Sequence, residues 1–596
     1  MKLHFIRVLK GRDWGSFLEP ILISSAASCL LCSRLCSSSF FTSSFLFVMS
    51  LNVRVQHPSN SVRAMLLRRS WSLPSTTLPL LVLLLFCGSS CLSLLCVAAA
   101  PGGGGRQGQG AGGRGGVGAL SWTSFARTLG IGDAAALADV VGNAPKKMVE
   151  QLADISDERH YDPRPRITRT FNSPAHREAA QIIAQWMREA GLAVTIDAMA
   201  NVRGVTPRDR VSAEGRHKPR VVVGSHYDTV IDGGKYDGAL GVIVGIQAVR
   251  ALLMAPGELS RPVEVIAFSD EEGVRFPVTF LGSRAVAGTL TDSILSISDK
   301  NGTTLLDAIK PHTRADVLAA ARDPEEIGTY VELHIEQGPV LEAANKGLGV
   351  VLAIAGQKRI TVSLMGEQGH AGTVPMGEQR RDTLAAAADM IIATERICQP
   401  GWSKRGGHLG ALKDNVSNEK EEMLVCTVGH IINMPNAKNT ISGAVNMTVD
   451  VRARREEVRD AAAEDISAAV HEACSARRME MCELVTSHEA PPVESAEAPT
   501  KRLRSAIAGF YGNYSSLPGT VKSVDDIPAL ISGAGHDALA MADIADVTMM
   551  FVRHPGGVSH SPLERVLDED IVSATGAMAL YLKDEVESGD DPTCGA

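Results

Sequence analysis

From about residue 140 the sequence alternates short runs of β-branched and apolar residues with longer helical segments. "RVVVGSHYD" (220–228), "PVEVIAFSD" (262–270) and "YVELHIEQG" (330–338) each begin as a buried strand, and "GALGVIVGIQAVRALL" (238–253) lies between the first two as a helix. Strands that are apolar throughout and separated by helices form a sheet that is covered on both faces. The sequence therefore predicts an α/β fold with a mainly parallel sheet and helices on both sides.

A second pattern begins after Ala355. "RITVSLMGE", "MLVCTVGHIINMPN" and "SGAVNMTVDVRAR" alternate apolar and polar residues with period two, and two helical segments lie among them. Strands with one polar face and a few helices predict a smaller α+β domain, inserted into the α/β domain. Residues 491–596 return to the first domain.

The N-terminal part of the chain differs from the rest. Arg68 and Arg69 precede an apolar run that ends in "CVAAA" and is followed by a Gly-rich tract. This is the pattern of a secretory signal peptide, although the run is nearly long enough to remain as an uncleaved signal-anchor. The sequence thus predicts the secretory pathway, with the endoplasmic reticulum lumen as the destination and a membrane attachment only if the signal is uncleaved.

The predicted organisation has six segments. They are an uncertain N-terminal extension (1–64), a signal peptide or signal-anchor (65–100), a flexible Gly-rich linker (101–139), the first part of the larger domain (140–354), the inserted domain (355–490) and the second part of the larger domain (491–596).

Charge and cysteine spacing argue against three classes of protein. The net charge of −8 gives no electrostatic basis for binding nucleic acid. Six of the eleven cysteines lie before residue 100, and the others show neither CxxC nor zinc-finger spacing, which argues against a disulfide framework and a structural zinc site. Sequons at Asn301, Asn415, Asn446 and Asn513 are compatible with a secretory lumen.

Histidines and carboxylates follow several of the predicted strands. His226 and Asp228 come directly after one strand, and Asp237 lies in a Gly-rich loop; "FSDEEG", "ELHIEQG" and "GGVSHSP" add Glu271, Glu272, His334 and His560. A single histidine after a strand is more often structural than a ligand. Several such positions together, at the edge where open α/β sheets bind ligands, predict a site for divalent metal ions.

Eight motifs in the chain resemble one superfamily. They are "GSHYDTV", "YDGALG", "SDEEGVRF", "ELHIEQGPVLE", "GQKRITVSLMGEQGHAGTVPM", "NMPNAKNTISGAVNMTVDVRA", "SGAGHDALAM" and "GGVSHSP". This set, which extends from about residue 140 to 585, resembles the metal-dependent M20 aminoacylase and carboxypeptidase superfamily, specifically its N-carbamoylase and allantoate amidohydrolase branch. In wording and order it is most similar to the plant-type allantoate deiminases. The resemblance implies that the inserted domain is a lid and dimerisation domain.

The resemblance implies two divalent metal ions per subunit, manganese in preference to zinc. Their ligands would be His226, Asp237, Glu272, His334 and His560, with Asp237 bridging the two ions. His334 stands where the peptidase relatives use a carboxylate, which favours the amidohydrolase branch. Asp228 would hydrogen-bond the His226 ring and fix its tautomer.

The resemblance also assigns the remaining roles. Glu271 would be the general base, which takes a proton from water and returns it to the departing nitrogen. His370 would come from the partner subunit of a homodimer and stabilise the oxyanion. Substrate would be bound by Gln357, Asn439, Arg452, Gly535 and His536. Arg452 can hold a carboxylate through two parallel hydrogen bonds.

The function that this implies is hydrolysis of a ureido C–N bond of allantoate to ureidoglycine, ammonia and CO2, in purine and ureide catabolism. Ureidoglycolate amidohydrolase and N-carbamoyl amino acid hydrolase share this chemistry and remain alternatives. A peptidase fits less well because of His334. A non-catalytic binding protein on the same fold is disfavoured because the base and all five ligand positions are present.

Overall fold

The computed structural model describes residues 121–158, 166–416, 418–512, 521 and 523–588, and the backbone of 83–87 and 90–94. The chain divides into two units, residues 1–110 and 111–596. In the first unit, β1 (Leu83–Cys87) pairs antiparallel with β2 (Ser90–Leu94). The predicted extension (1–64) and the rest of the predicted signal segment lie outside the described residues. Among the helices that are described, none is both long and apolar enough to cross a bilayer.

The second unit is built on a nine-stranded sheet in the order β15-β8-β17-β7-β5-β6-β4-β3, with β16 also paired to β8. Its centre, β6-β5-β7-β17, is parallel, whereas β3, β4, β8 and β15 make antiparallel pairs towards the edges. The predicted α/β fold with a mainly parallel sheet is confirmed. The strands are β3 (Ala193–Ile196), β4 (Val202–Val205), β5 (Arg220–His226), β6 (Val263–Phe268), β7 (Ile327–Ile335), β8 (Leu348–Ile354), β15 (Val493–Glu494), β16 (Ala529–Ser532) and β17 (Asp546–Val552).

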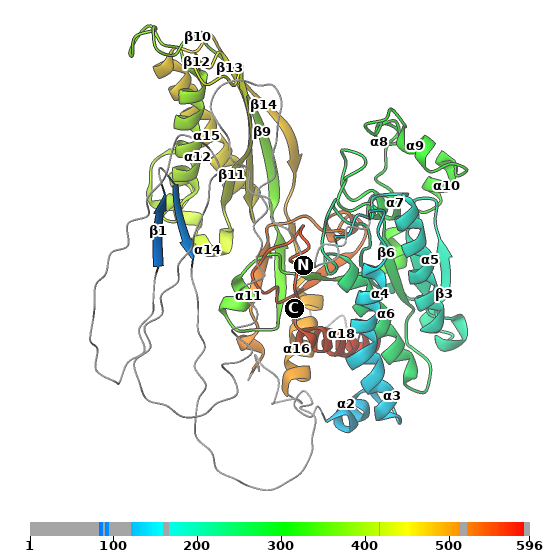
Figure 1. Cartoon of the computed structure of the whole chain (residues 1–596). Helices are drawn as coiled ribbons and strands as arrows, with labels where there is room; N and C mark the ends of the chain where they lie inside the picture. Colours follow the sequence, from blue (N-terminus) through cyan, green and yellow to red (C-terminus); the bar gives the residue numbers. More distant parts are fainter. Residues whose placement is uncertain are drawn as a thin grey trace, which may run out of the picture. The chain divides into compact units, whose positions relative to one another are not determined.

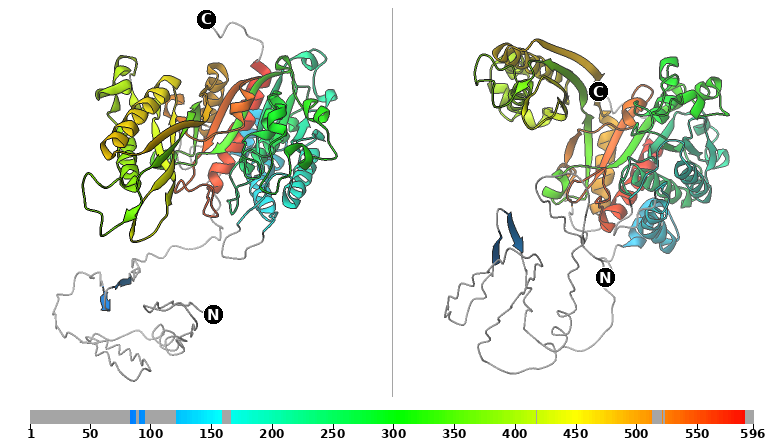
Figure 2. Two further views of the ribbon diagram at one scale, coloured as in Figure 1. Left: turned by 90° about the horizontal axis from the view of Figure 1, so that it is seen from above. Right: turned by 45° about the horizontal axis from the view of Figure 1, so that its top comes forward.

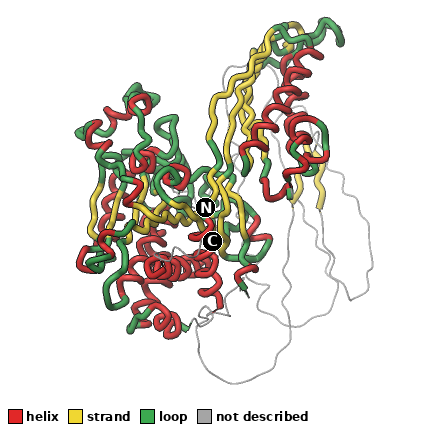
Figure 3. The backbone as a smooth tube through the Cα atoms, turned by 180° about the vertical axis from the view of Figure 1, so that it is seen from behind, coloured by secondary structure: helices red, strands yellow, loops and turns green. Residues whose placement is uncertain are grey.

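Helices cover both faces of this sheet. Successive residues of a strand point to opposite sides, and here apolar side chains on both sides pack against helices. Val221 and Val223 of β5 join one apolar core, and Val222 joins another. The first core includes residues of α4 (Ala144–Ala153), α5 (Pro174–Glu189), α6 (Ala239–Met254), α16 (Glu497–Gly512) and α18 (Asp568–Ser588). The second includes residues of α7 (Leu281–Ala287) and α17 (Ala538–Met541). Figure 3 shows these strands lying between helices, and Figure 2 shows the orange and red C-terminal elements beside the cyan and green ones.

Between β8 and β15 the chain forms a smaller α+β domain. Four antiparallel strands lie in the order β11-β13-β9-β14. Residues of β13 alternate between buried and half-buried, and the buried set packs with two long helices in a separate apolar core (Figure 1). The elements are β9 (Gly356–Met365), α12 (Thr383–Cys398), β11 (Val425–Met434), β13 (Ala444–Ala453), α15 (Glu456–Arg477) and β14 (Met481–Ala490), with a short pair, β10 (Gly369–His370) and β12 (Thr440–Ile441).

Part of the segment predicted as a linker (101–139) is structured, and residues 101–120 of it lie outside the described residues. Residues 122–138 form α2 (Trp122–Leu129) and α3 (Ala134–Ala138). Phe125, Leu129 and Leu137 are buried in the core shared with α6 and α18, and the Phe125 ring meets Phe510 edge-on. The apolar side chains at helical spacing, rather than the Gly-rich composition before them, decide the structure here.

Two disulfides hold the ends of the long helices of the small domain. Cys398 at the end of α12 bonds Cys426 in β11, and Cys474 in α15 bonds Cys482 in β14. The spacing of these cysteines did not predict the bonds, because each joins a helix end to a strand that returns beside it.

Candidate metal centre

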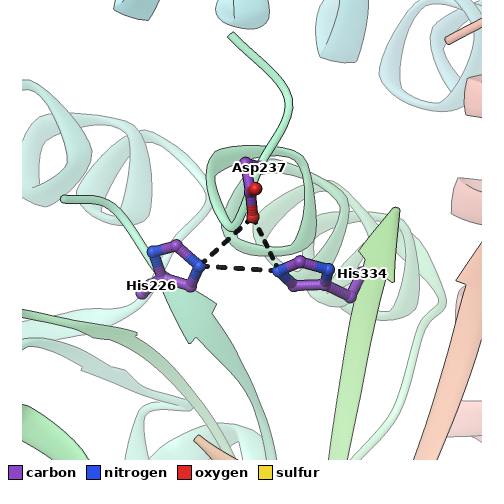
Figure 4. Close-up of side chains that lie close together, drawn as sticks. All are labelled: His226, Asp237 and His334. Carbon is purple, nitrogen blue, oxygen red and sulfur yellow. Dashed lines mark hydrogen bonds and ion pairs between the residues drawn. The ribbon is translucent and has the colours of Figure 1, made fainter. Parts of the chain in front are cut away.

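Three ligand-type side chains meet at the carboxyl edge of the parallel strands. His226 ends β5, His334 lies near the end of β7, and Asp237 stands in the loop before α6 (Figure 4). One oxygen of Asp237, Oδ1, lies 3.0 Å from Nε2 of His334 and 3.6 Å from Nε2 of His226. The two histidine Nε2 atoms are 3.5 Å apart.

A second group meets on the other oxygen of the same aspartate. Nε2 of His560 lies 3.6 Å from Oδ2 of Asp237 and 3.5 Å from Oε2 of Glu272. Asp237 therefore faces His226 and His334 with Oδ1, and with Oδ2 it faces His560, which also lies beside Glu272.

This donor set fits a pair of divalent cations. In each of the two groups, one ligand atom per residue lies within 4.8 Å of the others. Imidazole and carboxylate are ligands of zinc and manganese, and a carboxylate with one oxygen in each group is placed to bridge two ions. The five ligand residues that the sequence predicted thus come together from β5, β7 and three loops.

The buried carboxylates and histidines of the site shift one another's pKa values. Burial works to raise the pKa of Asp237, but the His334 and His226 rings outweigh it and hold that pKa well below its usual range. Burial raises the pKa values of Glu271 and Glu272 well above the usual range of a glutamate. The negative charge of Glu272 raises the pKa of Glu271 further, and the charge of Asp237 raises the pKa of Glu272 further. A bound divalent cation would offset this, because its charge would favour the ionised carboxylates.

Asp228 links His226 to the acidic turn after β6. Its Oδ1 lies 3.4 Å from Nδ1 of His226, and its backbone oxygen lies 3.2 Å from the same nitrogen. The carboxylate also accepts the backbone N–H groups of Glu271 at 3.0 Å and Glu272 at 3.2 Å. One buried side chain thus orients a ring and fixes the turn that carries both glutamates.

Three residues at the site have left-handed backbone conformations that residues other than glycine rarely adopt. Asp270, Gln337 and His560 have φ values of 54°, 56° and 54°. Asp270 immediately precedes Glu271, Gln337 follows His334 by three residues, and His560 is itself a candidate ligand. Such conformations cost free energy and persist where the surrounding structure requires them. At Asp270 the unusual turn directs Glu271 towards His226, with 4.0 Å between Oε2 and Nε2.

Part of the predicted substrate-binding set lies together. His536 is buried, and its ring packs edge-on against that of His334, with 4.5 Å between the ring centroids. Its Nε2 is 2.7 Å from Oγ of Ser532. Gly535 is next to it, and a Cβ there would lie 2.5 Å from the Phe280 ring. Arg452 of β13 donates from Nη1 to the backbone oxygen of Gly533 at 2.6 Å, so it reaches the same loop. In β9, Gln357 is paired in register with Arg452.

The other two predicted residues lie together elsewhere. His370 is exposed in β10, where it is paired in register with Thr440. Asn439 is the exposed residue before Thr440, and its backbone oxygen accepts the N–H of Ala371. Among the described residues, neither His370 nor Asn439 has a recorded hydrogen bond or ion pair to the metal-ligand group.

Two residues that the sequence did not single out contact Asp237. Gln337 donates from Nε2 to Oδ2 of Asp237 at 2.8 Å. Glu564 accepts the backbone N–H of Asp237 at 3.3 Å. The available signal was that Gln337 falls in "ELHIEQGPVLE", the motif of His334, and that Glu564 follows the motif "GGVSHSP" of His560 by two residues.

The family described as Peptidase family M20/M25/M40 matches residues 222–584, which include the strands and loops of the site. The chain belongs to this family. M20 membership agrees with the two-domain fold and with the candidate metal ligands.

Within the M20 family the chain is similar to curated proteins over most of its length. It is 44% identical to "Probable allantoate deiminase" of Oryza sativa subsp. japonica, over 73% of this chain and 86% of the rice protein. It is 35% identical to "N-carbamoyl-L-amino-acid amidohydrolase" of Pseudomonas sp. (strain NS671), over 73% of this chain and 95% of the Pseudomonas protein. The crystal structure of AtUAH in complex with glyoxylate has a TM-score of 0.59 and 27% identity, and covers 75% of this chain and 98% of that one.

Proposed function

We propose that this M20 protein is an allantoate amidohydrolase, which hydrolyses a ureido C–N bond of allantoate to give ureidoglycine, ammonia and CO2. The observation that carries the proposal is the meeting of five ligand-type side chains in two groups that share Asp237, with Glu271 beside them. Identity to the rice allantoate deiminase (44%) exceeds identity to the Pseudomonas carbamoylase (35%), which favours allantoate over an N-carbamoyl amino acid.

The residues would hold two cations, for which we propose manganese. His226, His334 and Oδ1 of Asp237 would hold one ion, and Glu272, His560 and Oδ2 of Asp237 the other. Such ions, when bound, polarise a carbonyl group and make water more acidic.

Glu271 is placed to move the proton. Its carboxylate is buried beside His226, and bound cations would keep it ionised, so it would accept a proton when water attacks the ureido carbon. It then returns the proton to the nitrogen that leaves as the C–N bond breaks. Asp228 fixes the backbone of Glu271 and thereby its distance from His226.

Arg452 is the proposed partner of the allantoate carboxylate. Its guanidinium donates to Asp450 from Nε at 2.8 Å and from Nη2 at 3.1 Å, and to the backbone oxygen of Gly533. A guanidinium has five N–H donors, so two remain for a substrate. Gln357 is paired in register with Arg452, and Arg452 contacts the loop that carries Gly535 and His536. Gln357, Gly535 and His536 would bind the ureido groups.

A homodimer would complete the site. His370 and Asn439 lie together in the β10–β12 region of the small domain, whereas His536 packs against His334 and Arg452 reaches the loop that carries His536. We propose that the partner subunit supplies His370 and Asn439, with His370 stabilising the oxyanion.

The small domain offers a surface for this association. β11 is an edge strand of its sheet, and Ile431, Ile432 and Met434 on it are exposed. An edge strand with exposed apolar side chains is suited to pairing with another chain.

The substrate proposal is tested with a panel on manganese-loaded protein. Released ammonia is measured with allantoate, ureidoglycolate and N-carbamoyl-β-alanine. We expect kcat/KM for allantoate to be about tenfold or more above the others, because a site built to hydrogen-bond one polar substrate discriminates against analogues that lack its groups. Protein with bound manganese and no allantoate turnover would contradict the proposal, and a higher kcat/KM for either rival would replace the substrate.

The two disulfides support a proposed location in the secretory pathway, in the endoplasmic reticulum lumen. Disulfides form and persist in oxidising compartments. Asn301, an acceptor asparagine of an Asn-X-Thr sequon, is exposed in a turn. Asn446, in a second Asn-X-Thr sequon, lies within β13 and donates from Nδ2 to Ser363 at 3.0 Å.

The location is tested by producing the full chain in a eukaryotic cell and mapping its peptides. We expect Cys398, Cys426, Cys474 and Cys482 to resist a maleimide unless the protein is reduced. We also expect an endoglycosidase-sensitive glycan at Asn301 and none at Asn446, which serves as the matched control. Free thiols at these four positions together with an unmodified Asn301 would contradict the location.

A further inference from the structure

One carboxylate connects the loop of His560 with the loop of Asp237. Glu564 lies four residues after His560 and is buried. Its Oε2 accepts the backbone N–H of Tyr236 at 3.1 Å and that of Asp237 at 3.3 Å. Its own backbone N–H donates to the oxygen of Ser561. Two ligand loops more than 300 residues apart in the chain thus meet at a single side chain.

The loop of Asp237 is shaped to admit this carboxylate. A Cβ at Gly234 would lie 2.1 Å from both Cδ and Oε2 of Glu564, so only glycine leaves room for the side chain there. The second oxygen, Oε1, is buried and has no hydrogen-bond partner among the described residues. Leaving a buried oxygen unpaired costs free energy. The two hydrogen bonds that Oε2 accepts from the loop of Asp237 have to offset this cost.

His560 depends on such an anchor more than the other two histidine ligands do. The side chains of His226 and His334 are 1% and 2% exposed, and packing holds them, whereas that of His560 is 52% exposed. The loop that carries His560 is attached at its start through the N–H of Gly556, which donates to Glu342 at 2.9 Å. Glu342 has no recorded hydrogen bond to Asp237 among the described residues, so Glu564 is the attachment that relates His560 to the bridging aspartate.

We propose that Glu564 is a positioning residue that sets the distance between Asp237 and His560 and so determines the affinity for the cation held by Glu272 and His560. This rests on the proposed two-ion site. Loss of the Glu564 carboxylate frees the N–H groups of Tyr236 and Asp237 and lets the His560 loop move away. The group formed by His226, His334 and Asp237 keeps its two buried histidines.

Manganese binding by the purified full chain tests this proposal, by equilibrium dialysis with metal analysis. In Glu564→Ala we expect the site of Glu272 and His560 to lose about 10–100-fold in affinity, as is usual when a residue that orients a ligand is removed. The other site keeps its affinity within about threefold, so that at limiting manganese the protein binds one ion. Glu564→Gln keeps an oxygen acceptor in the same place, and we expect it to restore binding of both ions.

The matched control is Glu342→Ala, which removes the anchor at the other end of the loop and is expected to keep both ions. The thermal unfolding midpoint of each variant separates a local change from loss of the fold. Two ions bound by Glu564→Ala with wild-type affinities, or an equal loss at both sites, would overturn the proposal. Because the measurement is metal binding, failure of the allantoate assay would contradict the proposed substrate and not the role of Glu564. A wild-type chain that binds only one ion would contradict both the role of Glu564 and the two-ion site.

Discussion

Glu271→Gln is expected to lower kcat for allantoate by about 10²–10⁴-fold, the contribution typical of a positioned general base. The amide has nearly the shape of the carboxylate but cannot take a proton from water. The two ligand groups that share Asp237 are left intact, so manganese content is expected to remain at the wild-type value. The measurements are steady-state ammonia release and metal analysis on the same preparation.

The control for this variant is Glu336→Gln, on the loop directly after β7. Glu336 is also nearly buried, and it accepts the N–H groups of Val340 and Leu341 at the start of α11 (Val340–Ala343), a role that an amide oxygen can keep. It is expected to retain activity within a few-fold, as is usual for a substitution that conserves shape and hydrogen bonds. A Glu271→Gln protein with kcat within tenfold of wild type would show that another group moves the proton.

A heterodimer of two inactive variants is expected to regain about half of the wild-type activity, because one of its two symmetric sites is complete. One subunit carries His370→Ala and the other Glu271→Gln. The His370→Ala subunit keeps its own Glu271 and receives an intact His370 from its partner, whereas the second site lacks both. Co-expression with two different tags and sequential affinity purification isolate the heterodimer for kinetic assay.

The two homodimers set the baseline for this experiment. His370→Ala is expected to lose about 10²–10³-fold in kcat, as for removal of one oxyanion donor. An inactive heterodimer of normal size would show that His370 acts within its own chain. A His370→Ala homodimer with wild-type kcat would show that it has no catalytic role.

Local sequence signals account for several of the observed elements. The helix α5 begins at Pro174 after Ser173, whose side chain accepts the N–H of His176, because a capping serine and a proline in the first turn both favour a start there. The helix α12 is one of the two helical segments predicted after Ala355. The strands that end in His226 and near His334 were also expected, since continuous apolar runs identify strands buried on both faces.

The candidate ligands were also recognisable in the sequence, because each stands at a strand end or in a glycine-rich loop. Their division into two groups was not recognisable in the sequence. Which oxygen of Asp237 faces His334 and which faces His560 depends on the loop conformations at the sheet edge. The sequence indicated three adjacent carboxylates in "FSDEEG"; only the left-handed backbone at Asp270 and the hydrogen bonds from Asp228 separate the directions of Glu271 and Glu272.

The sequence by itself therefore determined the fold class, the main helices and strands and the chemical types at the site, because caps, periodicity and residue type act over a few neighbouring residues. Only the tertiary structure decided that α2 and α3 belong to the core, that four cysteines pair in the small domain and that Glu564 reaches the loop of Asp237. The physical reason is the same in each case. These features come from contacts between segments that the folded chain brings together, in the last case across 327 residues.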